Sequence, residues 1–275
     1  MKPKAFDYVR AATSEEAVET LARAGEDAKI IAGGMSLVPM LNFRLLEPKI
    51  LVDITRLAGN DYIRLVGDTV EVGCATRQAA LEHWPELGDK LPLLKAAFPL
   101  LGHYQTRARG TVCGSLSHAD PSSELPLCLA TLGGEVVLRS RDGERTLPAA
   151  QFQTGMLQTA RRADEMVMAA RYPVRKPGAG YAFTEMAQRR GDFAVVAVAA
   201  MVDGSKIRLG VGGVADKPAV RDWDMLDGSA LDDALNAFAW ELGGYDDIHA
   251  TARYRRELVR RLGRRIIEEA KSCRS

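Results

Sequence analysis

The sequence predicts an α+β protein, and three stretches with different hydrophobic patterns support this fold class. Residues 13–54 alternate helical patterns with short apolar runs, which are typical of buried strands. Residues 59–174 contain two β-hairpins, whose turns fall at 67–68 and 142–143. Residues after 178 give three strand patterns in a row and then two long helical patterns. Strands and helices that segregate in this way favour an α+β fold.

In the first stretch, a capping box at Thr13 begins an amphipathic helix. A buried strand is predicted over 29–32, and two glycines follow it. Ser36 is expected to cap the next helix, which runs to Leu45. A second strand is predicted over 50–54. This order indicates a helix between two parallel strands.

The middle stretch is predicted to contain short helices as well as the two hairpins. Thr76 is expected to cap one of them, and residues 91–101 form another. Residues 102–117 are rich in Gly, Ser and Thr, so we expect a loop there. Ser122 is expected to cap an apolar helix, and 165–172 is a further strand.

A segment with one proline and two glycines, residues 174–180, predicts a linker before the last part of the chain. The elements expected beyond it are strands over 181–188, 193–202 and 206–214 and helices over 232–242 and 252–271.

Composition excludes several classes of function. The formal net charge is +1, from 37 basic and 36 acidic residues, which argues against a nucleic-acid-binding protein. No run of about 18 apolar residues is present, so we expect no membrane-spanning helix. The first residues do not form the apolar core of a secretory signal, so a cytoplasmic location is expected. The four cysteines form no C-x-x-C pair, and we therefore expect no metal ligands on this chain.

Two glycine-bearing segments, residues 32–36 and 111–115, are the strongest functional signal in the residues themselves. Each leads into a helical pattern, and backbone N–H groups at such a place can bind a pyrophosphate. Neither segment is a G-x-G-x-x-G fingerprint or a P-loop. Taken alone, each could equally be a tight turn; taken together, they favour a dinucleotide cofactor.

Five segments in order resemble signatures of one family, the medium, flavin-binding subunit of the molybdenum hydroxylases. This is the family of the xanthine dehydrogenase and carbon monoxide dehydrogenase flavoproteins. The segments are residues 6–8, 30–39, 109–121, 189–194 and 254–258. The resemblance extends over the whole chain.

The resemblance implies an FAD-binding fold of the vanillyl-alcohol oxidase type. It implies two FAD-binding subdomains, residues 1–58 and 59–174, with the flavin between them. It also implies a C-terminal domain, residues 178–275, with a small antiparallel sheet and helices.

The function implied by the resemblance is electron transfer within a heterotrimer. A large subunit that binds the molybdenum cofactor would oxidise the substrate, and a small subunit with two [2Fe–2S] clusters would relay electrons. The present chain would hold FAD and pass the electrons to NAD⁺ or another acceptor. The resemblance implies no catalytic side chain and no metal site on this chain.

The resemblance also assigns FAD contacts to particular positions. The pyrophosphate and ribityl contacts would come from Ile30, Ile31, Ala32, Gly33, Gly34, Met35, Ser36 and Leu37, and from Thr111, Val112, Cys113, Gly114 and Ser115. The remaining contacts would be Leu101 near the adenine, Glu124 at a ribose, Val167 through its backbone, and Glu185 and Phe193 near the flavin ring.

Four residues depart from the family pattern. Met35, Cys113 and Ser115 replace the usual Gln or His, Gly and Asn, and Glu185 stands where Lys is common. Because these changes fall in the FAD segments, an alternative is a flavin-free assembly or scaffold subunit with the same fold. A free-standing flavin oxidase is a third hypothesis, but no acid or base for a substrate supports it.

Two further patterns have simpler interpretations than a second function. Ser115, His118 and Asp120 are too close in sequence for the usual catalytic triad, and Asp120 suits an Asx turn before proline. The arginine-rich stretch 253–265 also carries apolar residues at helical spacing. We interpret it as an amphipathic helix whose charged side faces solvent or a partner subunit.

Overall fold

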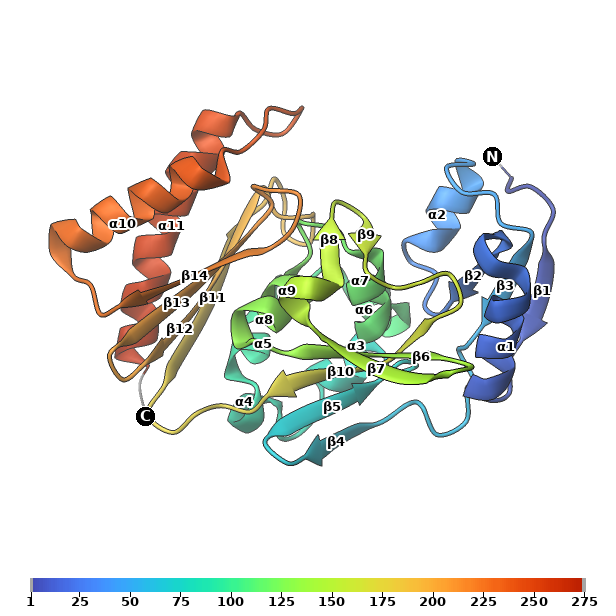
Figure 1. The fold of residues 1–275 in the computed structure, drawn as a ribbon. Helices are drawn as coiled ribbons and strands as arrows, with labels where there is room; N and C mark the ends of the chain where they lie inside the picture. Colours follow the sequence, from blue (N-terminus) through green and yellow to red (C-terminus); the bar gives the residue numbers. More distant parts are fainter. Residues whose placement is uncertain (1, 274–275) are drawn as a thin grey trace.

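The computed structural model describes residues 2–273 and contains three main β-sheets, each with its own helices (Figure 1). In Figure 1 the second unit lies between the other two, with the first unit on the right and the third on the left. The observed mixture of sheets and helices is the predicted α+β fold.

The first unit is a three-stranded parallel sheet in the order β1-β3-β2. Its elements are β1 (Asp7–Arg10), α1 (Ser14–Ala24), η1 (Gly25–Asp27), β2 (Ala28–Ile31), α2 (Leu37–Asn42) and β3 (Ile50–Asp53). The predicted capping box is confirmed, since Thr13 Oγ1 accepts a hydrogen bond from the Glu16 N–H at 3.2 Å. The parallel strand pair is confirmed as well. Strand β1 was not predicted, because its exposed and charged residues have no apolar run.

The helix after the two glycines differs from the prediction. Ser36 has helical backbone angles and makes no capping hydrogen bond through its side chain. Helix α2 ends at Asn42 instead of Leu45, because Arg44 adopts a left-handed conformation with φ +56°. A non-glycine residue in that region ends a right-handed helix.

The second unit is a five-stranded antiparallel sheet in the order β4-β5-β10-β6-β7. Its strands are β4 (Ile63–Val66), β5 (Thr69–Gly73), β6 (Glu135–Ser140), β7 (Gly143–Pro148) and β10 (Met166–Pro173), and a small ribbon is formed by β8 (Gln153–Gly155) and β9 (Gln158–Thr159). Its helices are α3 (Gln78–Glu82), α4 (Leu87–Lys90), α5 (Pro92–Ala97), α6 (Tyr104–Arg109), α7 (Val112–His118), α8 (Glu124–Leu132) and α9 (Ala149–Phe152). Both predicted hairpins are confirmed.

Several helix starts in this unit were predicted wrongly. Thr76 does not cap α3, because its hydroxyl bonds both the N–H and the carbonyl of Tyr62 at 3.0 Å. Helix α8 begins after Ser123 and not after Ser122. Residues 102–117 are not a loop, since they contain α6 and α7. Helices this short have little stability of their own, and tertiary packing, which local sequence does not report, stabilises them.

The third unit is a four-stranded antiparallel sheet with two helices. Its elements are β11 (Gly180–Met186), β12 (Val196–Asp203), β13 (Lys206–Gly212), β14 (Ala219–Asp224), α10 (Gly228–Leu242) and α11 (Ala252–Ser272). The three predicted strands and both helices are confirmed, while β14 was missed because Arg221, Asp222 and Asp224 interrupt its apolar residues.

The sheet of the third unit is buried on both faces. Along β12, Ala197, Ala199 and Met201 belong to the hydrophobic core shared with the second unit. Their neighbours Val196 and Val198 belong to a separate core beneath α10 and α11. Successive side chains of a strand point to opposite faces, so a strand between two cores is apolar at every position.

One arginine of the C-terminal helix does not lie on its charged side. The Arg255 side chain is buried, with only 1% of the residue exposed. Its guanidinium donates to the carbonyl oxygens of Val195 at 2.6 Å and Gly213 at 2.7 Å, and it pairs with Asp247 at 2.6 Å. The prediction that this stretch is an amphipathic helix is correct, but Arg255 is part of its buried side.

Within residues 2–273, no helix combines the length and the apolar character needed to cross a bilayer. We propose the predicted ranges 1–58, 59–174 and 178–275 as the limits of the three units.

Candidate cofactor-binding site

A cavity of about 730 Å³ lies where the three units meet. Its wall takes residues from β2 and the glycine segment after it, from α2, and from the start of α7. The other side is formed by α8, β10 and the segment between β11 and β12. The volume lies in the range of pockets that bind small molecules and cofactors.

The first glycine segment packs directly against Arg109 and Gly110, the two residues that lead into the second segment, and Gly33 and Gly110 both line the cavity. A Cβ atom built on Gly33 would lie 2.6 Å from the Gly110 Cα and closer still to the Arg109 carbonyl oxygen. Any side chain at this position would push the first segment away from residues 109–110. Gly34 adopts φ +72°, which glycine reaches without strain. The close approach to residues 109–110 therefore depends on glycine at position 33, and the turn that follows depends on glycine at position 34.

Helix α7 begins in the cavity wall with a side-chain cap. Thr111 Oγ1 accepts a hydrogen bond from the Gly114 N–H at 3.0 Å. A Cβ on Gly114 would lie 2.5 Å from that oxygen, so the cap requires glycine here. Cys113 is buried in this turn, and its thiol lies 3.6 Å from the Val72 carbonyl oxygen.

Gln78 provides a buried acceptor that faces no protein donor. It is 6% exposed and lines the cavity, and its Oε1 atom has no hydrogen-bond partner within residues 2–273. Buried polar atoms are nearly always paired in folded proteins. A ligand with N–H or O–H groups would satisfy this oxygen, and FAD has both on its adenine, ribityl chain and flavin ring.

All but three of the residues that the sequence assigned to the cofactor line the cavity. Those in the wall are Ile30, Ala32, Gly33, Gly34, Met35, Ser36, Leu37, Leu101, Thr111, Cys113, Gly114, Ser115, Glu124, Val167 and Phe193. The three outside it are Ile31, Val112 and Glu185. Ile31 points away because Ile30 and Ala32 face the cavity and strand side chains alternate.

Several wall residues were not assigned from the sequence. Gly191 and Asp192 line the cavity and lie in the segment 189–194, whose resemblance to the family could have identified them. Gln78 and Arg161 carried no signal, because no motif surrounds them. His118 was considered in the triad and lines the cavity, whereas Asp120 forms the expected Asx turn. Its Oδ1 accepts from the Ser122 N–H at 2.8 Å.

Two carboxyl groups, Glu124 in the cavity wall and Glu185 outside it, have pKa values raised well above the usual range. Burial and the charge of Asp120 raise the pKa of Glu124, which lines the cavity, to about 7. Burial and the neighbouring Glu124 raise the pKa of Glu185 to about 8. One Glu185 oxygen is buried without a hydrogen-bond partner in the described part of the chain. Burial lowers the pKa of His118, which favours the neutral form of its ring.

A pH dependence of stability follows from Glu185. An unfolded chain releases this proton near pH 4.5, but the folded protein keeps it to about pH 8. Because the folded state binds more protons in this interval, the free energy of unfolding falls as pH rises through it. We expect Glu185→Gln to raise the melting temperature at pH 8.5 and to change it little at pH 5.

Thermal melting at the two pH values, followed by circular dichroism, measures this difference. Glu144→Gln is the matched control, since Glu144 is exposed on β7 and should give no pH-dependent change. A Glu185→Gln curve parallel to that of the wild type would contradict the prediction.

Comparison with known proteins assigns the chain to a family. Residues 4–175 match the model of the FAD binding domain in molybdopterin dehydrogenase. Residues 181–270 match the CO dehydrogenase flavoprotein C-terminal domain. The chain belongs to the FAD-binding medium subunits of the molybdenum hydroxylases. The resemblance seen in the sequence is thereby confirmed.

Relatives of this medium subunit span its whole length. The nicotine 6-hydroxylase medium subunit of Paenarthrobacter nicotinovorans is 38% identical, over 98% of this chain and 99% of the relative. The carbon monoxide dehydrogenase medium chain of Afipia carboxidovorans is 32% identical, over 99% of each chain. A solved carbon monoxide dehydrogenase from Hydrogenophaga pseudoflava superposes with a TM-score of 0.95 at 29% identity, covering 100% of both chains.

The medium subunit is therefore an FAD-binding oxidoreductase subunit. The cavity fits this cofactor, because both glycine segments and the unpaired Gln78 acceptor meet there. The departures at Met35 and Cys113 do not fill it. No cluster of three or more metal-binding side chains lies within residues 2–273.

Proposed function

We propose that the medium subunit is the electron-transfer subunit of a heterotrimeric molybdenum hydroxylase. It would receive electrons from the [2Fe–2S] clusters of a small subunit, while a large subunit with the molybdenum cofactor oxidises the substrate. It would deliver them to NAD⁺ or another acceptor. The names of the relatives, which are medium subunits or chains, support this assembly. We also propose the cytoplasmic location expected from the sequence.

The observation that carries the proposal is the cavity between the three units. Bound FAD supplies redox chemistry that joins one-electron donors to two-electron acceptors. The protein binds and orients the cofactor and sets its electrostatic surroundings. All three units contribute residues to the cavity wall, so the relative positions of the units determine where the cofactor is held.

We assign the individual contacts as follows. The glycine segments 32–36 and 111–115 would hold the diphosphate through their backbones. Leu101 would pack near the adenine, Glu124 would meet a ribose hydroxyl, and Phe193 would lie beside the flavin ring. Glu124, with its pKa near 7, can donate or accept a hydrogen bond there.

The three assigned residues outside the wall would act indirectly. Val112 is fully buried and would position the first turn of α7. Ile31 would support Gly34, since its Cδ1 lies 3.6 Å from a Cβ built on that glycine. Glu185 would act through Glu124, because, in addition to burial, ionisation of Glu124 raises the pKa of Glu185.

The test is an FAD titration of the purified chain, followed by reduction and a survey of acceptors. We expect FAD fluorescence to be quenched on binding and the bound flavin absorption to bleach on chemical reduction. NAD⁺, a soluble quinone and oxygen are then added separately, and recovery of the absorption identifies the acceptor.

The outcomes separate the functions considered. Recovery with NAD⁺ or the quinone supports electron transfer and names the carrier. Rapid recovery with oxygen alone would instead support a free-standing oxidase. A chain that fails to bind added FAD would overturn the proposal and favour the scaffold alternative.

A further inference from the structure

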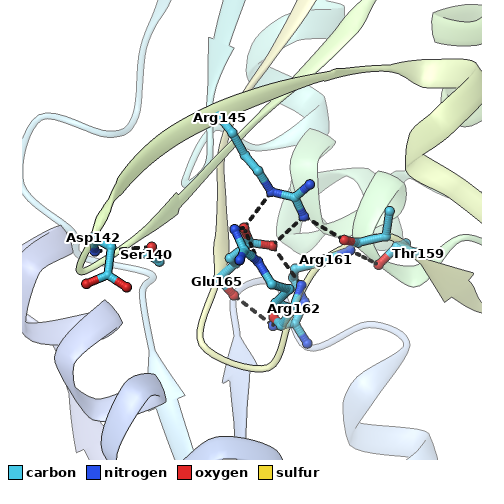
Figure 2. A network of polar contacts seen from close by, with 8 residues as sticks. Ser140, Asp142, Arg145, Thr159, Arg161, Arg162 and Glu165 are labelled. Carbon is cyan, nitrogen blue, oxygen red and sulfur yellow. Dashed lines mark hydrogen bonds and ion pairs between the residues drawn. The ribbon is translucent and has the colours of Figure 1, made fainter.

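A network of arginines borders the cofactor cavity and contains one buried carboxylate. Glu165 is 1% exposed, and Arg145 donates to its two oxygens at 2.6 and 2.8 Å. Arg162 pairs with the same carboxylate at 3.0 Å. Burial alone would raise the pKa of Glu165, but these bonds lower it to about 2. Figure 2 shows the side chains gathered around Glu165.

Arg161 belongs to this network but has no carboxylate of its own. Its Nη1 donates to the carbonyl oxygens of Arg162 at 2.8 Å and Glu165 at 2.7 Å. Neither an ion pair nor a hydrogen bond from its Nε or Nη2 is found within residues 2–273. Arg145 and Arg162 together outweigh the single charge of Glu165. The charge of Arg161 is therefore not neutralised by the network.

Arg161 occupies a partly desolvated place in the cavity wall. It is half-buried and lines the cavity. Burial lowers its pKa, which indicates that the guanidinium is partly desolvated. Placing a charge in such a site is costly unless an opposite charge compensates for it.

The other charged residues of the cavity wall do not provide that compensation. Lys29 is a second cation and is paired with Glu26 at 3.0 Å. Asp192 is paired with Arg189 at 3.0 Å. Burial raises the pKa of Glu124 to about 7, so this carboxyl is only partly ionised near neutral pH. Outside the wall, the carboxylates of Glu26, Glu165 and Asp164 favour the charged form of Arg161 through space, but none of them forms an ion pair with it within residues 2–273. The Nε and Nη2 donors of Arg161 therefore remain available to a ligand.

We propose that Arg161 is an FAD-binding residue that engages a negative charge of the cofactor. The charge is either the diphosphate, which is always ionised, or the flavin ring, which can become anionic on reduction. The proposal rests on the assignment of this cavity to FAD. A guanidinium fixed by carbonyl oxygens on one nitrogen is pre-oriented to use its remaining donors.

The experiment compares Arg161→Met with Arg161→Lys, which keeps the charge. Arg162→Met is the matched control, because Arg162 is the exposed neighbour in the same network and lies outside the cavity wall. Each purified apo chain is titrated with FAD and with riboflavin, which lacks the diphosphate. The reduction potential of bound flavin and the melting temperature are then measured.

If Arg161 meets the diphosphate, Arg161→Met should weaken FAD binding by about tenfold or more and leave riboflavin binding unchanged. If it meets the flavin ring, the same variant should shift the reduction potential to more negative values. In both cases Arg161→Lys should restore much of the wild-type value, and Arg162→Met should resemble the wild type.

Unchanged FAD affinity and unchanged potential in Arg161→Met would overturn the proposal. So would equal losses in Arg161→Met and Arg161→Lys that follow a lower melting temperature, since they would show a structural role. Failure of the wild-type chain to bind FAD would instead contradict the assignment of the cavity.

Discussion

Gly33→Ala is expected to abolish tight FAD binding, because one added methyl group would push the first glycine segment away from residues 109–110, which lead directly into the second. The new Cβ would lie 2.6 Å from the Gly110 Cα. Both neighbouring groups are backbone, so no side chain can rotate away to relieve the overlap. Overpacking of this kind typically costs about 1–3 kcal/mol, and here that strain falls on the cofactor cavity.

FAD fluorescence quenching measures the affinity, and urea unfolding measures the stability of the same sample. Gly88→Ala is a matched control, since a Cβ on Gly88 in α4 would meet nothing within 4 Å. Alanine is favoured over glycine in a helix by up to about 1 kcal/mol, so this control should be neutral or more stable. An FAD affinity of Gly33→Ala within about twofold of the control, well under 1 kcal/mol, would contradict the proposed contact of the first segment with residues 109–110.

Arg255→Met is expected to cause the largest loss of stability. The substitution leaves the carbonyl oxygens of Val195 and Gly213 without their buried donor, and it leaves Asp247 without its cation. Removing one partner of a buried ion pair typically costs about 3–5 kcal/mol. FAD affinity should fall too, because Val195 follows the segment that brings Phe193 to the cavity.

Urea unfolding followed by circular dichroism gives the change in the free energy of unfolding. Arg261→Met is the control on the same helix, since the Arg261 side chain is 77% exposed and pairs with Glu257. Exposed pairs of this kind contribute less than about 1 kcal/mol. A similar small loss for Arg255→Met would show that its buried hydrogen bonds are replaced after substitution.

Sequence patterns predicted the helices and strands whose own residues carry a clear turn, helix or strand pattern. The hairpin turn at 142–143 and helix α11 are examples, because turn residues and helical spacing are properties of short segments. Strands β1 and β14 were missed because they lie at sheet edges, where polar residues are tolerated. Their place is decided by pairing with distant strands, and no local pattern records it.

Only part of the site was predicted, because only some of its residues give a local sequence signal. The segments 32–36 and 111–115 were predicted because glycines that lead into a helical pattern are typical of phosphate-binding loops. Gln78 and Arg161 were not found, since an isolated polar residue gives no indication of which cavity it lines. Arg255 was placed on the charged side of its helix because composition cannot distinguish a solvated arginine from one bonded to buried carbonyls.

Because the β11–β14 sheet is buried on both faces, the C-terminal unit and the rest of the chain should fold and unfold together. Removing residues 178–275 would uncover the apolar surface against which Ala197, Ala199 and Met201 pack. The remaining chain would then aggregate instead of folding as a smaller flavoprotein. Backbone amides of β12 should accordingly exchange with solvent only through global unfolding, at the slowest rate in the molecule. Loss of the cofactor and loss of the sheet would thus be one cooperative event.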